Sequence, residues 1–238
     1  MRLDKFLSLN GCCSRSEAKR AVRVGGVLVN DKAPKSADIS VDPEKDIIVF
    51  GGKRVIYRKH IYIMLNKPEG YVSATEDGKD KTVLELLPDE ARRAGLFPCG
   101  RLDKNTLGLM LITDDGDLAH RLLAPKSHVS KIYRFKSKFP ISRADADRFE
   151  AGVTLEDGYV TLPAKIELDD DALGGYITLR EGKYHQIKRM LEALDNKIIY
   201  LERVTFGPLT LDTALERGEW RYLTESEIAA LENGEKIN

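Results

Sequence analysis

A charged loop beside a buried strand holds the residues best suited to chemistry. Residues 109–112 are Leu-Met-Leu-Ile, and this apolar run ends near an Asp-Asp-Gly turn signal, which predicts a strand covered on both faces. Arg101, Asp103 and Thr106 lie just before it, where the chain would emerge from the sheet. A carboxylate held at a sheet edge beside a cation is a candidate reactive group, although most Arg-x-Asp triplets are structural.

A cation further along the chain could pair with this carboxylate. Apolar residues recur there at helical spacing, at Ile187, Met190, Leu191 and Leu194. At about 100° per residue, Lys188 lies at the border of that apolar stripe, so its ammonium would be partly buried. A buried ammonium needs a counter-charge, and we predict that Asp103 supplies it. A salt bridge without chemistry is the alternative for this pair.

The elements that would position these groups alternate between strands and helices. Apolar or alternating runs predict strands at 61–65, 109–112, 131–135 and in the segment before Gly182, with helices at 117–123 and after Gly182. In the 131–135 strand, the alternation of side chains places Tyr133 on the same face as Lys131 and Phe135. Such a tyrosine is most often a half-buried sheet residue.

The first 57 residues have a different character. Leu3, Phe6 and Leu7 have helical spacing, and the Ser14-Arg-Ser-Glu17 capping box begins a second helix. That helix carries four cations opposite its apolar stripe, and Gly25-Gly26 ends it; the cations are Arg15, Lys19, Arg20 and Arg23. A solvated helix face and a phosphate-binding face are both compatible with this pattern.

The charge of the whole chain hides an asymmetry between its parts. Thirty-eight Lys and Arg residues balance 38 Asp and Glu residues over 238 positions. Residues 1–60 nevertheless hold 13 basic and 7 acidic residues, whereas residues 61–238 hold 25 basic and 31 acidic ones. A cationic module is therefore joined to a mildly acidic body, and contacts to phosphate from such a module would give affinity without sequence information.

Composition and motifs also indicate which cellular compartment and which cofactors to expect. The three cysteines, two of them adjacent, allow neither a disulfide framework nor zinc spacing. No run approaches the roughly 20 apolar residues of a membrane span, so we expect a cytoplasmic protein that does not contact membranes. No Walker loop, no GxGxxG after a strand and no cluster at metal-ligand spacing is present, so we expect no cofactor and no metal.

Three blocks in the body resemble a known family. The Gly100-Arg-Leu-Asp-x-x-Thr-x-Gly-Leu109 loop, the Lys131-x-Tyr133 strand and the block at 181–190 are similar to the pseudouridine synthases that modify ribosomal RNA. The resemblance implies that Asp103 is catalytic, that Tyr133 packs against the target base, and that Lys188 pairs with the aspartate. It also implies a mixed, mainly antiparallel sheet with flanking helices, so the expected fold class is α+β.

The N-terminal block resembles the S4 RNA-binding domain through its Arg2-Leu-Asp-Lys-Phe-Leu start and its basic helix. The expected organisation is an S4-like domain at residues 1–57 and a catalytic domain at residues 58–238. The resemblance places residues of both parts on the RNA, and we expect RNA contacts from Arg2, Arg15, Lys19, Arg20, Arg23, Lys67, Arg101, Thr106 and Gln186.

The function that follows is the isomerisation of one uridine in small-subunit (16S) ribosomal RNA to pseudouridine, as a step of ribosome biogenesis. The reaction needs no redox change, and the target base would have to be flipped out of its stack. We expect a monomer whose partner is ribosomal RNA, free or in an assembly intermediate. A large-subunit (23S) synthase of the same family and a non-catalytic RNA-binding assembly protein are the alternatives.

Overall fold

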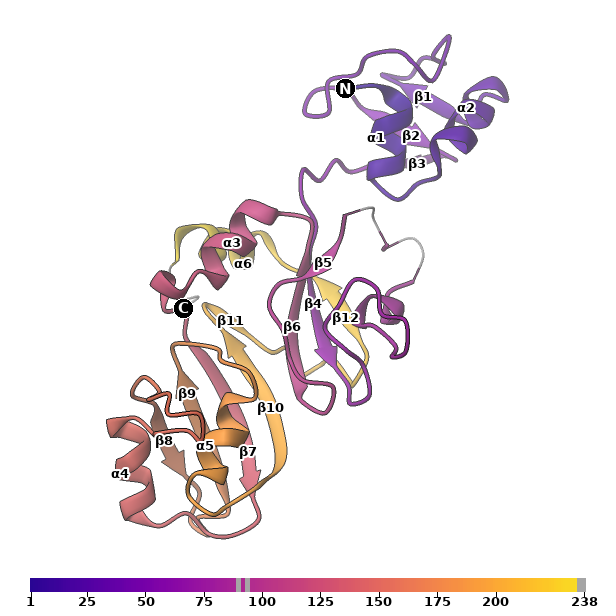
Figure 1. The fold of residues 1–238 in the computed structure, drawn as a ribbon. Coiled ribbons are helices and arrows are strands. Elements are labelled where there is room, and N and C mark those ends of the chain that lie inside the picture. Colours follow the sequence, from indigo (N-terminus) through magenta and orange to yellow (C-terminus); the bar gives the residue numbers. More distant parts are fainter. Residues whose placement is uncertain (89–90, 93–94, 235–238) are drawn as a thin grey trace. The chain divides into compact units, whose positions relative to one another are not determined.

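The computed structural model describes residues 1–88, 91–92 and 95–234. Contacts between residues divide the chain into two compact units (Figure 1). The first comprises Met1–Ile61 with Leu87–Leu96, and the second comprises Tyr62–Leu86 with Phe97–Asn238. All the residues expected to do chemistry lie in the second unit.

The first unit contains two helices and a small antiparallel sheet. Helices α1 (Leu3–Leu9) and α2 (Arg15–Arg23) pack on strands β1 (Val27–Val29) and β2 (Ile48–Phe50), and the exposed strand β3 (Lys53–Arg54) pairs with β2. The predicted capping box is present, because the Ser14 hydroxyl accepts from the Glu17 N–H and the Glu17 carboxylate accepts from the Ser14 N–H. The core holds apolar side chains from both helices and the sheet, among them Leu3, Phe6, Leu7, Ala18, Val22, Val27 and Ile48.

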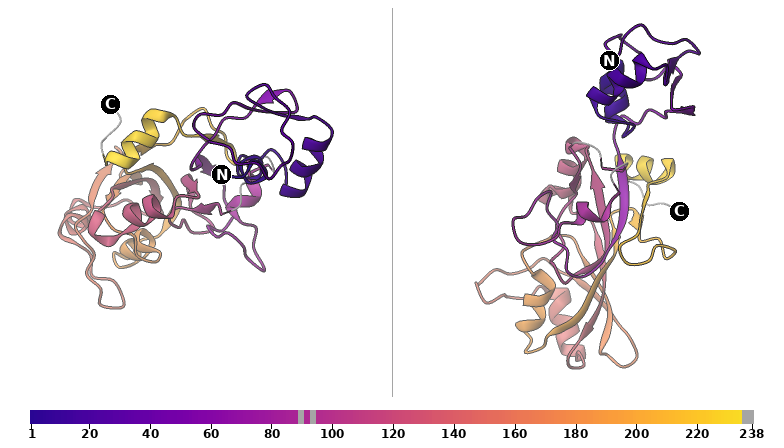
Figure 2. Two further views of the ribbon diagram at one scale, coloured as in Figure 1. Left: turned by 90° about the horizontal axis from the view of Figure 1, so that it is seen from above. Right: turned by 90° about the vertical axis from the view of Figure 1, so that its right-hand side faces the viewer.

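The second unit is built on one large sheet. Its strands are β4 (Tyr62–Lys67), β5 (Phe97–Pro98), β6 (Leu107–Thr113), β7 (Lys131–Ser137), β8 (Lys165–Leu168), β9 (Gly174–Leu179), β10 (Ile198–Phe206), β11 (Leu209–Thr210) and β12 (Trp220–Tyr222). The main order is β12-β4-β6-β10-β7-β9-β8, with β5 paired to β6 and β11 paired to β10. The views in Figures 1 and 2 show that this sheet twists along its length, as sheets of L-residues do.

Strand β10 joins the two halves of that sheet. It pairs antiparallel with β7 on one side and parallel with β6 on the other, where Arg203 lies opposite Gly108. Among the described strand pairs of this sheet, β6 with β10 is the parallel one, and the rest are antiparallel. The sheet therefore brings the end of the predicted charged loop next to a strand from the C-terminal third of the chain.

Most α-helices of the second unit begin at a residue whose side chain caps them, and each buries apolar residues. The helical elements of the unit are η1 (Val83–Leu86, a 3-10 turn), α3 (Gly116–Leu123), η2 (Pro125–Ser127, a 3-10 turn), α4 (Arg143–Ala151), α5 (Gln186–Glu192) and α6 (Glu225–Asn233). The Asp115 carboxylate accepts from the Leu118 N–H at the start of α3. Side chains of α3 and α6 pack on alternate residues of β4 and β6 such as Tyr62, Met64, Leu109 and Leu111, which makes one face of the sheet the main core.

The α+β class and the mainly antiparallel mixed sheet are confirmed. The predicted domain boundary after residue 57 stays a prediction, since contacts place 58–61 with the first unit and also join 87–96 to it. In the described part of the chain, no helix has both the length and the apolar character needed to cross a membrane.

Candidate active site

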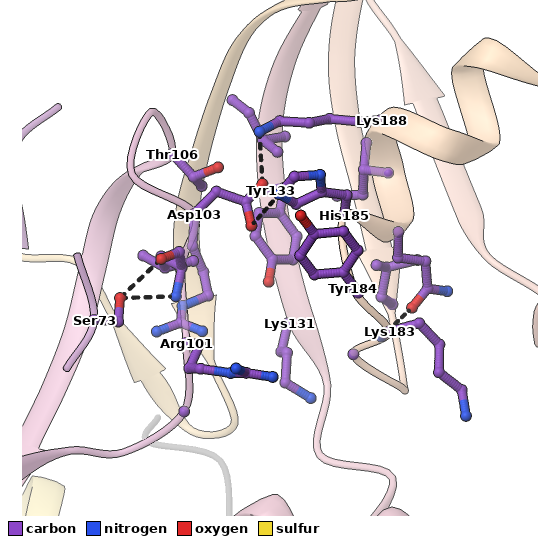
Figure 3. Close-up of a pocket in the computed structure, with 18 of the residues that line it drawn as sticks. Ser73, Arg101, Asp103, Thr106, Lys131, Tyr133, Lys183, Tyr184, His185 and Lys188 are labelled. Carbon is purple, nitrogen blue, oxygen red and sulfur yellow. Dashed lines mark hydrogen bonds and ion pairs between the residues drawn. The ribbon is translucent and has the colours of Figure 1, made fainter. Parts of the chain in front are cut away.

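A pocket opens where the 100–106 loop, strands β7 and β10 and the start of α5 meet (Figure 3). Its lining includes all three residues for which a catalytic role is predicted, Asp103, Tyr133 and Lys188. The predicted Arg101, Thr106 and Gln186 line it too. Side chains from segments far apart in the sequence thus meet around one space that is large enough for a ligand.

The predicted ion pair between Asp103 and Lys188 is present. The Lys188 Nζ atom lies 2.6 Å from the Asp103 Oδ2 atom, and each side chain is 26% exposed. Ile187, Met190 and Leu191 are buried in α5, so Lys188 lies at the border of the apolar stripe as its spacing predicts. The pair is therefore neither fully desolvated nor free in water, and the carboxylate remains reachable from the pocket.

Lys67 holds the loop that carries Asp103. Its side chain is completely buried, and its ammonium shares its three N–H donors among the backbone carbonyls of Pro68, Asp103, Lys104 and Thr106, which lie at 2.9–3.1 Å. Burial lowers the pKa of Lys67 to about 8, although the charge of Asp103 acts in the opposite direction. A side chain with no exposed surface has no atom to offer to RNA, so we propose that Lys67 positions the loop instead.

Two further features define the path of the loop. The Ser73 hydroxyl donates to the Leu102 carbonyl at 2.8 Å and accepts from the Leu102 N–H at 3.0 Å. At Gly108, where the loop enters β6, φ is +97° and an added Cβ would lie 2.3 Å from the carbonyl oxygen of Arg203. That glycine is required because no side chain fits between the two parallel strands.

Strand β7 forms the wall of the pocket. Tyr133 is 9% exposed, and it lines the pocket together with Lys131 two residues before it, as alternation predicts. Lys131 donates to the Val129 carbonyl at 3.0 Å, and burial, with a smaller effect from the Arg203 guanidinium, lowers its pKa to about 8. The wall thus offers an aromatic ring with a cation beside it.

Arg203 of β10 is a buried cation beneath the pocket. It is 1% exposed, its Nε atom donates to the Leu109 carbonyl at 2.8 Å, and its guanidinium lies 4.9 Å from the Phe206 ring centroid. Sequence patterns alone did not predict a place for it in the site. A long charged side chain in a strand is ordinarily exposed, so no local signal separates this arginine from a surface residue.

His185 is a second neighbour of Asp103 that sequence reasoning did not assign. Its Nε2 atom lies 3.5 Å from the Asp103 Oδ1 atom. The residue has φ of +49° and precedes the first turn of α5, which directs its side chain toward the loop. Its ring also stacks on that of Tyr184, with centroids 3.8 Å apart.

Three predicted RNA-contacting residues of the body occupy different environments. Arg101 is exposed at the pocket. Thr106 is 2% exposed, and its hydroxyl is one of two buried side-chain polar atoms that have no hydrogen-bond partner among the described residues. Gln186 is 4% exposed, accepts from the Lys183 N–H and donates to Glu181. Arg101 is therefore the most accessible of the three, while Gln186 mainly fixes the segment before α5.

The predicted cations of the first unit are at its surface. Arg15, Lys19, Arg20 and Arg23 are exposed on α2, and Arg20 approaches Glu17 only at 4.0 Å. Arg2 is half exposed but pairs with Asp4 at 2.8 Å and Asp38 at 2.5 Å. The α2 cations are thus available to a ligand, whereas Arg2 is largely engaged within the unit.

The geometry suits attack on an electron-poor carbon or removal of a proton by one carboxylate. Asp103 has two cationic or cationisable neighbours and faces a pocket with an aromatic wall. Carboxylates act in such settings as nucleophiles or as bases. Among the described residues, no group of three or more His, Cys, Asp or Glu side chains is arranged to hold a metal ion.

Similarity to known proteins identifies the family. The model of the RNA pseudouridylate synthase family matches residues 61–193, and the S4 domain model matches residues 1–47. The chain belongs to the RNA pseudouridylate synthase family. The part of the chain that holds the pocket lies almost wholly within the first match.

The relatives are similar over nearly their whole length. An uncharacterized RNA pseudouridine synthase of Bacillus subtilis (strain 168), YtzG, is 47% identical over 97% of this chain and 98% of its own. The ribosomal small subunit pseudouridine synthase A of Vibrio cholerae is 42% identical, covering 97% and 99%, and that of Escherichia coli K12 is 39% identical, covering 97% and 100%. A crystal structure of a pseudouridylate synthase has a TM-score of 0.68 at 38% identity, covering 97% of this chain and 99% of that one.

The predicted resemblance and enzyme class are therefore confirmed: the chain is a pseudouridine synthase that acts on RNA and carries an S4 domain. The alternative of a non-catalytic assembly protein is not supported. The roles of individual residues, the monomeric state and the cytoplasmic location stay predictions.

Proposed function

We propose that this synthase converts a uridine of small-subunit ribosomal RNA to pseudouridine, with Asp103 as the reacting carboxylate. The observation that carries the proposal is the Asp103–Lys188 ion pair of 2.6 Å in a pocket whose wall contains Tyr133. The reaction needs a carboxylate that can act as a nucleophile or a base, and the Lys188 ammonium is the counter-charge beside it. Lys188 contacts the Oδ2 atom of Asp103 and does not occupy the Oδ1 atom.

The reaction rearranges one nucleotide without an external reactant. The bond between N1 of uracil and C1′ of ribose breaks, the base turns, and a bond forms between C5 and C1′. The proton on C5 leaves and N1 gains one, so atoms and electrons balance. Asp103 would act as the nucleophile at the sugar or as the base that removes a sugar proton, and both roles require a carboxylate beside the sugar.

The target base has to leave its stack before Asp103 can reach the sugar. Flipping costs a few kcal/mol, and stacking on an aromatic ring returns about 1–3 kcal/mol. Tyr133, on the pocket wall, offers that ring. Arg101 is exposed two residues before Asp103, and we propose that it enters the space that the base leaves.

One feature favours small-subunit RNA as the substrate, and a second favours RNA in general. Several relatives that align over nearly the whole chain are named ribosomal small subunit pseudouridine synthase A. The S4 domain presents the four exposed α2 cations, which suit contacts to phosphates. Such contacts hold RNA without reading its sequence, so selection of the uridine would fall to the body.

Mapping of pseudouridine after reaction in vitro tests this proposal. The purified chain would be incubated separately with protein-free 16S RNA, with 23S RNA and with small-subunit assembly particles, and the Asp103→Asn variant would serve as the control. We expect one new pseudouridine in 16S RNA or its particles with the wild type and none with the variant. Modification confined to 23S RNA would contradict the proposed substrate, and equal modification by the variant would contradict the proposed role of Asp103.

A further inference from the structure

Tyr184 is an unusually exposed aromatic residue at the pocket. Its side chain lines the pocket and is 71% exposed, whereas Tyr133 on the pocket wall is 9% exposed. Figure 3 shows the Tyr184 ring at the pocket beside His185. Leaving a large ring in water forgoes the free energy that its burial would give, so an aromatic residue held open beside a ligand pocket is a candidate contact for the ligand.

The ring of Tyr184 is held in place before any ligand binds. It stacks on the His185 ring with centroids 3.8 Å apart and an angle of 18° between the planes. His185 in turn has its Nε2 atom 3.5 Å from the Asp103 Oδ1 atom. One face of the Tyr184 ring is therefore covered by imidazole, and its exposure is concentrated on the rest of the ring.

Two cations belong to the same pocket as this ring. Arg101 and Lys183 are both exposed and both line the pocket. The Lys183 ammonium lies 4.6 Å from the Tyr159 ring centroid, which favours a position at the surface near α5. Phosphates of a bound strand would be attracted to these cations, and the strand would then pass the open face of Tyr184.

We propose that Tyr184 stacks on a base adjacent to the target uridine and so fixes the register of the RNA strand. The proposal deepens the proposed function and rests on it for the target nucleotide. Tyr133 lies inside the pocket and suits the flipped base, so the more exposed ring of Tyr184 is available to a neighbouring base of the RNA. Unpaired loop RNA has splayed bases that readily stack on aromatic side chains. Stacking of about 1–3 kcal/mol corresponds to an effect of roughly 5- to 150-fold on kcat/KM.

A cycle of protein and RNA changes tests the proposal. The RNA is a synthetic fragment around the mapped uridine, made intact, with the 5′ neighbour abasic, or with the 3′ neighbour abasic. Wild-type protein and the Tyr184→Ala variant would each be assayed on all three. We expect Tyr184→Ala to lower kcat/KM by roughly 5- to 150-fold on intact RNA and by less than about twofold on one of the two abasic RNAs, because the partner is already missing there.

The controls separate stacking from other roles. Tyr184→Phe keeps the ring and should stay within about threefold of wild type, because stacking needs no hydroxyl. Tyr176→Ala removes a 42% exposed tyrosine of β9 that does not line the pocket, and it should leave kcat/KM unchanged. The slope of log affinity against log salt should not change with Tyr184→Ala, since no charge is lost.

Two results would overturn the proposal. An equal loss on all three RNAs would show that Tyr184 only supports His185 and Asp103, and no loss on intact RNA would show that the ring is not used. A different result would contradict the proposed function. If Asp103→Asn kept its activity, the role assigned to Asp103 would be wrong, but the rates of the wild type and of Tyr184→Ala on the three RNAs could still be compared.

Discussion

Replacing Lys67 by Met separates a positioning role from an RNA contact. Met keeps most of the length and the apolar stem of the side chain but removes the ammonium. Two of the four carbonyls that accept from Lys67 keep another donor, because Thr106 N donates to Asp103 O and Gly70 N donates to Lys104 O. The loss therefore falls mainly on the carbonyls of Pro68 and Thr106.

The expected cost follows from those two carbonyls. A buried acceptor without its donor costs about 1–3 kcal/mol, which gives about 2–6 kcal/mol for the pair. Removing the buried charge offsets part of this, so we expect the free energy of unfolding to fall by about 1–3 kcal/mol at neutral pH. Because the same bonds hold the Asp103 loop, kcat should also fall, by at least about tenfold.

The effect of pH on stability has a definite sign. The pKa of Lys67 is about 8 in the folded protein, below its ordinary 10.5, so the unfolded chain binds more protons between these values and wild-type stability rises with pH there. The loss of stability that comes from burying the charged form of Lys67 is fully present below pH 8 and absent above pH 10.5. The gap corresponds to about 3 kcal/mol, so the difference in unfolding free energy between wild type and Lys67→Met should widen by up to that amount.

Urea unfolding at several pH values, together with single-turnover kinetics, measures these effects. Lys104→Met is the matched control, because Lys104 belongs to the same loop but is 47% exposed and pairs with Asp80; its cost should stay below about 1 kcal/mol. If Lys67→Met instead leaves stability unchanged while lowering RNA affinity and the salt slope by about 0.7–0.9, Lys67 contacts phosphate and the positioning role is wrong.

Three further predictions test other parts of the structure. Lys188→Met should lower kcat by at least about 100-fold with RNA affinity nearly unchanged, since an interaction that supports the reacting group acts on kcat. Lys188→Arg keeps the positive charge and should recover part of the lost kcat. An equal loss of kcat in both variants would show that charge is not what Lys188 supplies. A second variant replaces the exposed cations of α2 by Gln, at Arg15, Lys19, Arg20 and Arg23. It should bind RNA more weakly, and the magnitude of the slope of log affinity against log salt should fall by about 3. An unchanged slope would exclude this helix from the interface. Gly108→Ala should destabilise the second unit by about 3 kcal/mol or more, measured by urea unfolding, because its Cβ would lie 2.3 Å from a backbone oxygen of β10; a cost below about 1 kcal/mol would mean that the two strands separate easily.

Local patterns in the sequence predicted those elements that have a clear period. Strands β4, β6 and β7 and helices α2, α3 and α5 all lie at predicted places. The central strand β10 was not predicted, nor were α4 and β8. In β10 the polar residues Glu202, Arg203 and Thr205 interrupt the apolar pattern, and the burial of Arg203 depends on its bond to the Leu109 carbonyl of β6. That contact exists only once the sheet has formed.

The part of the site that could be predicted is the part where the helical spacing of a residue and its charge gave the same answer. The helical position of Lys188 and its need for a counter-charge predicted the pairing with Asp103 that the structure contains. His185 could not be found in this way, because its approach to Asp103 depends on a positive φ just before α5. Lys67 was expected to face RNA, since nothing in the sequence reveals that its acceptors are carbonyls of a loop distant along the chain.

The Asp103→Asn variant tests the central role of the ion pair most directly, when pseudouridine formation and RNA affinity are measured on the same preparation. Asn has nearly the same shape but is neither a nucleophile nor a base. We expect single-turnover formation of pseudouridine to fall by at least about 10⁴-fold while the Kd for RNA stays within about threefold. A variant that still modifies its RNA within about tenfold of the wild-type rate would contradict the assignment of this carboxylate as the reacting group.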